Sequence, residues 1–147
     1  MTTTAPIADS RAIALTHYAA RGVLESVLSR HDATFQQSVT LRVIAVAEGP
    51  IERDAAVGQV VQSLKTDAAR IQGTVEELVS KGLCATEGAA LRLTDAGREF
   101  YDTVTAETAE ISARIWADIP AEDLAAAGRV LAVVTERANA ELAALRS

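Results

Sequence analysis

Residues 66–97 read TDAARIQGTVEELVSKGLCATEGAALRLTDAG, and this stretch decides the fold. Apolar residues recur at helical spacing from Ile71 to Val79, which predicts a helix. Thr66 or Asp67 can cap its first turn by accepting backbone N–H groups, and Gly82 suits the left-handed position beyond its last turn. Two short apolar runs, 83–86 and 91–93, surround a turn and predict a small β-hairpin.

Outside this stretch the sequence predicts helices almost everywhere. Apolar residues keep helical spacing over residues 9–30, from residue 35 to the break at Gly49-Pro50, and over 57–64. After the hairpin, Thr94 can cap a long helix that ends near Ile119-Pro120, and a last helix follows. Residues 35–99 thus have the order of a winged helix-turn-helix, in which the second helix of the turn lies in a DNA major groove.

The composition suits one mainly α domain over residues 1–147. The chain is 49% hydrophobic and 3% aromatic, which is enough apolar surface for a core. No apolar run reaches membrane-spanning length, and the first residues lack the charged-then-apolar layout of a signal peptide. Cys84 is the single cysteine and has no internal disulfide partner. We therefore expect a cytoplasmic protein that does not enter a membrane.

Signals for catalysis are missing from the sequence. It contains no glycine-rich phosphate loop, no GxSxG or HExxH motif and no paired cysteines. His17 and His31 are too far apart to share a helix face at close spacing, and neither has a cluster of ligands around it. We expect no catalytic residues, no metal and no cofactor.

Three segments resemble the MarR family of transcriptional regulators. Residues 75–83, VEELVSKGL, are similar to the end of its recognition helix, and residues 91–97, LRLTDAG, match its LTxxG motif. Residues 118–124, DIPAEDL, follow where family members turn into their last helix. The resemblance covers essentially the whole chain. It implies a homodimer, with a dimerisation layer over about 9–34 and 100–147 around a DNA-binding lobe over about 35–99.

The same resemblance implies which side chains meet double-stranded DNA. Arg70 can contact guanine or hold a phosphate, and Gln72 can read adenine. Gly73 stands where many family members carry arginine, and the hairpin tip 87–90 has no cation. The predicted DNA-contacting residues are Lys65, Thr66, Asp67, Ala68, Arg70, Gln72, Gly73, Thr74 and Arg92.

Charge leaves a second function open. The net charge is −6, and residues 101–147 hold four basic and eight acidic residues, a net of −4. Residues 51–100 hold six basic and eight acidic residues, a net of −2, so the predicted DNA-binding lobe has a small basic footprint. The favoured function is a DNA-binding regulator, with a repressor as the expected mode. The alternative is a protein-interaction module of the same fold with weak or lost DNA binding.

The resemblance also implies a small anionic or aromatic effector. His17, Arg21 and Arg42 are the candidates to receive it, although His17, Arg21 and Glu25 can instead form a surface ladder at four-residue spacing. Cys84 has two interpretations as well, a small buried hydrophobic residue or an exposed oxidation switch beside Lys81. The first interpretation is favoured.

Overall fold

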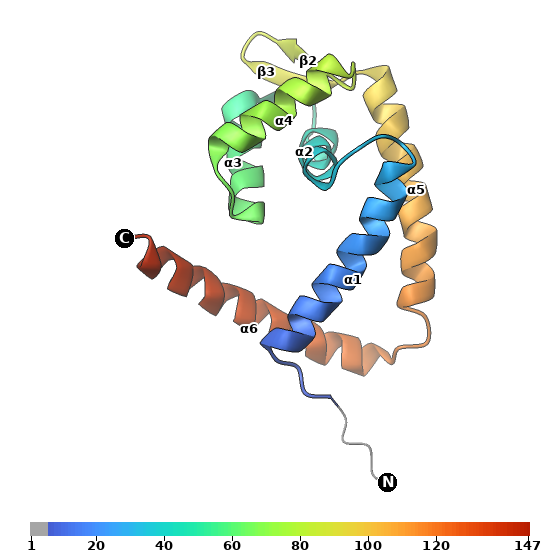
Figure 1. The fold of residues 1–147 in the computed structure, drawn as a ribbon, viewed down its shortest axis with the longest axis vertical. Helices are drawn as coiled ribbons and strands as arrows, with labels where there is room; N and C mark the ends of the chain where they lie inside the picture. Colours follow the sequence, from blue (N-terminus) through green and yellow to red (C-terminus); the bar gives the residue numbers. More distant parts are fainter. Residues whose placement is uncertain (1–5) are drawn as a thin grey trace. The chain divides into compact units, whose positions relative to one another are not determined.

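The computed structural model describes residues 6–147; residues 1–5, on which part of the signal-peptide expectation depends, lie outside it. Its elements are α1 (Ser10–Ser29), α2 (Phe35–Val46), β1 (Ile51–Glu52), α3 (Arg53–Leu64), α4 (Ala68–Ser80), β2 (Cys84–Glu87), β3 (Ala90–Leu93), α5 (Asp95–Ile115) and α6 (Ala121–Leu145) (Figure 1). The chain divides into two compact units, one up to Ala109 and one from Glu110 to Ser147. Across residues 6–147, no helix has both the length and the apolar character that crossing a membrane requires.

Side-chain caps set where the helices begin. Asp9 accepts a hydrogen bond from the Ala12 N–H at 2.8 Å at the start of α1. Thr34 and Gln37 form a reciprocal capping box at the start of α2. Each cap satisfies a backbone N–H that has no partner inside its helix. At the end of α4, Gly82 has φ of +74°, the left-handed conformation that the sequence predicts there.

The predicted hairpin is the larger part of a three-stranded antiparallel sheet with the order β1-β3-β2. β2 and β3 are the expected strands, with Cys84 opposite Leu93. β1 was not predicted; it adds two residues to the other edge, where Ile51 lies opposite Leu91. The next residue, Arg53, donates its backbone N–H to Ala89 O at 2.9 Å. The start of α3 is therefore fixed to the tip of the hairpin. The three-stranded sheet together with this tip is called the wing below.

The core of the first unit lies where α2, α3, α4 and the sheet meet. Ile71, Val75 and Leu78 are fully buried, which confirms the predicted inward face of α4. Cys84 belongs to the same core and is 2% exposed. Burial raises the pKa of the Cys84 thiol to about 11, because the thiolate is poorly solvated there. The structure thus favours packing over an oxidation switch for this residue.

α6 is the main element of the second unit, and none of its 25 residues is buried. Its exposed apolar side chains repeat at helical spacing, as the sequence predicts, but they face no core. The large ones are Leu124, Val130, Leu131, Val133, Val134 and Leu145.

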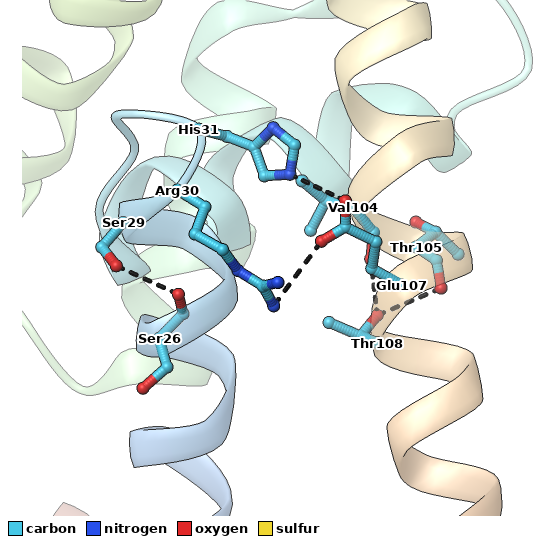
Figure 2. Close-up of polar contacts among 8 residues, drawn as sticks. All are labelled: Ser26, Ser29, Arg30, His31, Val104, Thr105, Glu107 and Thr108. Atoms are coloured by element: carbon cyan, nitrogen blue, oxygen red, sulfur yellow. Dashed lines mark hydrogen bonds and ion pairs between the residues drawn. The ribbon is translucent and has the colours of Figure 1, made fainter.

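Within the first unit, the end of α1 is joined to α5 by polar contacts (Figure 2). His31 Nε2 lies 3.1 Å from Glu107 Oε1, and Arg30 Nη2 lies 3.8 Å from the other carboxylate oxygen. The His31 ring also meets the edge of the Phe100 ring, with 6.1 Å between centroids. These contacts fix the α1–α2 loop to α5.

The beginning of α5 is joined to the wing by backbone contact. Thr94 donates its hydroxyl to Gly82 O at 2.6 Å and accepts from the Gly97 N–H at 3.0 Å, which confirms Thr94 as the cap of this helix. Position 97 has no room for a side chain, because a Cβ added to Gly97 would lie 1.9 Å from Leu83 O. The LTxxG motif therefore packs the first turn of α5 directly on the chain entering β2.

Candidate nucleic-acid interface

A three-residue turn connects α3 to α4 and positions the N-terminus of α4. Lys65 has φ of +56° and donates its backbone N–H to Val61 O, which ends α3. Asp67 then caps α4 by accepting from the Arg70 N–H at 2.8 Å. Of the two predicted caps, Asp67 is the one used. Its carboxylate is therefore committed to the first turn of the helix.

Past the cap, the exposed face of α4 carries small side chains and few charges. Ala68, Arg70 and Gly73 are exposed there, together with Glu76. The Arg70 guanidinium forms no ion pair with any of residues 6–147, so it is available to a phosphate or a guanine edge. An added Cβ at Gly73 would meet nothing within 4 Å, so this position is open as well.

Thr74 is a correction to the predicted interface. It is 3% exposed, and its hydroxyl lies 3.2 Å from Arg70 O and 3.4 Å from Gln36 Oε1. The reason is its position three residues after Ile71 and four before Leu78, which places it on the buried face of the helix. The prediction that Thr74 lies on the DNA-facing surface is wrong.

Gln72 is half-buried and lies in a polar cluster that the sequence did not reveal. Its Oε1 accepts from Arg53 Nε at 2.6 Å, and its Nε2 lies 3.5 Å from Asp54 Oδ1. Arg53 also donates from Nη2 to Glu76 Oε1 at 3.1 Å. These partners are 18 to 23 residues apart in the chain, so no local pattern pointed to Arg53.

The wing carries the last predicted contact, Arg92 on β3. Its Nε lies 3.8 Å from Glu87 Oε2, and both side chains are more than half exposed. Such an exposed pair contributes little to stability, but it lowers the positive charge that the wing offers to DNA. Arg53 and Arg92 therefore both face glutamates. Lys65, exposed in the turn, and the half-buried Thr66 beside it have no such partner in the described part of the chain.

The three predicted effector residues are all exposed. Arg21 forms an ion pair with Glu25 at 2.9 Å, and its guanidinium carbon lies 4.2 Å from the centre of the Phe35 ring. His17 lies beside Tyr18 and does not join that pair. The structure thus forms the Arg21–Glu25 half of the surface ladder, and the cavity described next is lined by residues other than His17, Arg21 and Arg42.

A cavity of about 260 Å³ lies elsewhere in the first unit. Its lining residues are His31, Asp32, Ala33, Lys81, Leu83 and Phe100. Across residues 6–147, no group of three or more histidine, cysteine, aspartate or glutamate side chains is placed to hold a metal ion.

A helix-turn-helix followed by an antiparallel wing defines the winged helix-turn-helix class. A sequence profile described as a helix-turn-helix family matches residues 13–144, and the chain belongs to that family. A comparison with curated protein sequences finds no match.

Solved structures with the same fold include several MarR-family proteins. Staphylococcus aureus MarR in complex with salicylate and kanamycin superposes with a TM-score of 0.76 at 18% identity, covering 89% of this chain and 90% of that one. CouR from Rhodococcus jostii, bound to p-coumaroyl-CoA, gives 0.69 at 17%, covering 83% and 87%. A MarR-family regulator from Silicibacter pomeroyi gives 0.67 at 19%, covering 85% and 88%. The fold is therefore that of the MarR-family proteins, as the sequence motifs predicted.

Proposed function

We propose that this chain is a cytoplasmic transcriptional regulator, acting as a repressor, that inserts α4 into the DNA major groove. One observation carries the proposal: the first turns of α4 are exposed, and the Arg70 guanidinium there has no ion-pair partner among residues 6–147. Arg70 reads a guanine or holds a phosphate, and Lys65 and Thr66 contact the backbone at the preceding turn. Asp67 acts through the cap, while the exposed Ala68 and Gly73 let the helix approach closely.

Binding to the DNA upstream of its own gene tests this function. Affinity should fall steeply as salt rises, because each phosphate contact releases counterions. Arg70→Ala should weaken binding by about 1–3 kcal/mol if Arg70 reads a base. Arg146→Ala, which removes the same charge at the end of α6, is the matched control and should change binding little. Equal binding by the Arg70 variant and the wild-type protein would reject α4 as the reading helix.

The operator and the domain organisation follow from a proposed homodimer. Residues 9–34 and 100–147 form its dimerisation layer, and residues 35–99 form the DNA-binding lobe, with Tyr18 and Trp116 as exposed aromatic contacts. The apolar side chains that α6 exposes support this arrangement. A two-fold symmetric dimer requires a pseudo-palindromic operator with half-sites about one helical turn apart. Light scattering at micromolar concentration tests the dimer, and a monomer there would reject it.

A small anionic aromatic effector is part of the proposal. Its support is the pair of relatives whose structures contain salicylate and p-coumaroyl-CoA. Salicylate is the probe: increasing concentrations should release the protein from DNA. His17→Ala, Arg21→Ala and Arg42→Ala should each raise the salicylate concentration required. Release that is unchanged in all three variants would place the effector elsewhere.

The charge distribution favours one alternative, a protein-interaction module that retains the fold. Arg53 and Arg92 are paired with glutamates, and residues 51–100 have more acidic than basic side chains. The salt titration separates the two functions. A regulator prefers an upstream fragment in a salt-sensitive way, whereas the interaction module shows no preference for any fragment.

A further inference from the structure

Glu76 is an acidic side chain on the face of α4 that is turned away from the core. Ile71, Val75 and Leu78 are fully buried on the opposite face of the helix. The Glu76 side chain is 73% exposed. Gly73, one turn earlier, has no side chain, and a Cβ added there would meet nothing within 4 Å. A DNA duplex that meets this face of α4 therefore finds open space at Gly73 and a carboxylate beside it.

The carboxylate of Glu76 is only partly occupied by its partner within the chain. Arg53 Nη2 donates to Glu76 Oε1 at 3.1 Å, whereas Oε2 accepts no hydrogen bond from any donor among residues 6–147. The guanidinium places a positive charge beside the carboxylate, which reduces the repulsion between Glu76 and DNA phosphates. Glu76 can therefore enter a major groove with at least one oxygen free to accept a hydrogen bond.

The chemistry of a carboxylate limits what Glu76 can recognise there. An ionised carboxylate accepts hydrogen bonds and cannot donate them. In the major groove, guanine presents only the acceptors N7 and O6, and thymine presents the acceptor O4 and a methyl group. The donors are the amino groups, cytosine N4 and adenine N6, and each base pair has one of them, on one strand. A carboxylate therefore distinguishes which strand of a base pair carries the amino base.

We propose that Glu76 is a specificity-determining residue that requires an amino base, cytosine or adenine, on the strand it contacts. Arg70 lies six residues earlier on the same helix, which is about 9 Å along the helix axis, whereas successive base pairs are about 3.4 Å apart. Glu76 therefore reads a different base pair from Arg70. This inference deepens the proposed DNA binding by α4 and rests on it.

Selection of binding sites from a randomised double-stranded DNA library tests the inference. Glu76→Ala should relax the preference at one base pair of each half-site, which identifies the pair that Glu76 reads. At that pair, wild-type protein should prefer cytosine or adenine over guanine or thymine on one strand by roughly fivefold, the size of one hydrogen bond. Glu76→Gln adds an amide donor in the same place and should raise guanine and thymine relative to cytosine at that pair.

Glu77→Ala is the matched control, because it removes the same charge from the next position of α4. Glu77 Oε2 accepts from Gln37 Nε2 at 2.7 Å, so this carboxylate is turned toward α2. The control variant should keep every base preference of the wild-type protein. Both glutamates are exposed, so neither truncation leaves a cavity, and circular dichroism checks that both variants are folded.

Each outcome supports or overturns the inference. A wild-type preference for guanine or thymine at the pair that Glu76→Ala relaxes overturns it while leaving the proposed function intact. Two other results do the same: base preferences that are unchanged in Glu76→Ala, and an equal loss of preference in Glu77→Ala. If wild-type protein selects no site at all, the proposed function fails and this inference fails with it.

Discussion

α4 and α6 both carry apolar residues at helical spacing, yet they bury their side chains very differently. α4 has 13 residues and buries four of them, including Ile71 and Leu78. α6 has 25 residues and buries none, and Leu131 and Val134 remain 45% and 41% exposed. An apolar stripe is stabilising only when a partner removes it from water. α4 has its partners within the first unit, whereas the apolar side chains of α6 remain exposed in the single chain.

The largest expected effect is on the α4 side of this comparison. Leu78→Ala should lower the free energy of unfolding by about 3 kcal/mol, because a fully buried leucine leaves a cavity when truncated. Urea denaturation measures the change. Val46→Ala is the matched control at a 60% exposed position of α2, outside the proposed dimerisation layer, and should remain within about 0.5 kcal/mol of the wild-type value. Similar losses at both positions would mean that the inward face of α4 is not what stabilises the core.

The next effect concerns the exposed stripe of α6. Replacing Leu131 and Val134 together with glutamate should weaken dimerisation by roughly 100-fold, because two apolar contacts are lost and two charges would have to be buried. Sedimentation or light scattering over a dilution series gives the dissociation constant. A dimer of undiminished stability would show that α6 does not face the second copy.

Cys84 gives a pH-dependent test of the core that α4 helps to form. Burial raises the pKa of its thiol from 9.0 to about 11, so the folded state holds the proton more tightly than the unfolded state. The contribution of the protonated Cys84 thiol to the free energy of unfolding is therefore fully present below pH 9. It falls by about 2 kcal/mol as the pH rises to 11. Cys84→Ala should remove that part of the decline, as measured by denaturation at several pH values. An identical pH profile in the variant would mean that the thiol is not buried.

The smallest effect concerns the outer face of α4. Gly73→Ala should stabilise the chain by about 1 kcal/mol, since alanine is the better helix former and the added Cβ meets nothing within 4 Å. Thermal unfolding detects a change of this size. Gly128→Ala on α6 is the matched substitution, also with open space in the single chain. If a second copy covers α6, Gly128→Ala should stabilise the protein less than Gly73→Ala does. A destabilising effect of Gly73→Ala would mean that the face of α4 at Gly73 is not open to solvent.

Features encoded locally could be predicted from the sequence. Asp67 as a cap, Gly82 in a left-handed conformation and the inward face at Ile71 each depend on a few neighbouring residues. The LTxxG motif also pointed correctly to the joint between the wing and α5, since only glycine fits at Gly97. Local spacing and turn chemistry were sufficient for these elements.

Features that depend on distant partners were missed. β1 has two residues, too few to show alternation, and its partner strand lies about 40 residues further along the chain. Arg53 had no local signal because Gln72 and Glu76 lie on the next helix. For these two features the missing information was a contact across the fold. Thr74 is different: the family resemblance assigned it to DNA, although its spacing from Ile71 and Leu78 on the same helix already placed it on the buried face.

The joint at Gly97 also has a mechanical meaning. The first turn of α5 touches the backbone of Leu83 with no room for a single extra carbon, and the far end of the same helix continues into the second unit. The first turn of α5 and the chain entering β2 are therefore in direct backbone contact, and neither can shift toward the other at this point.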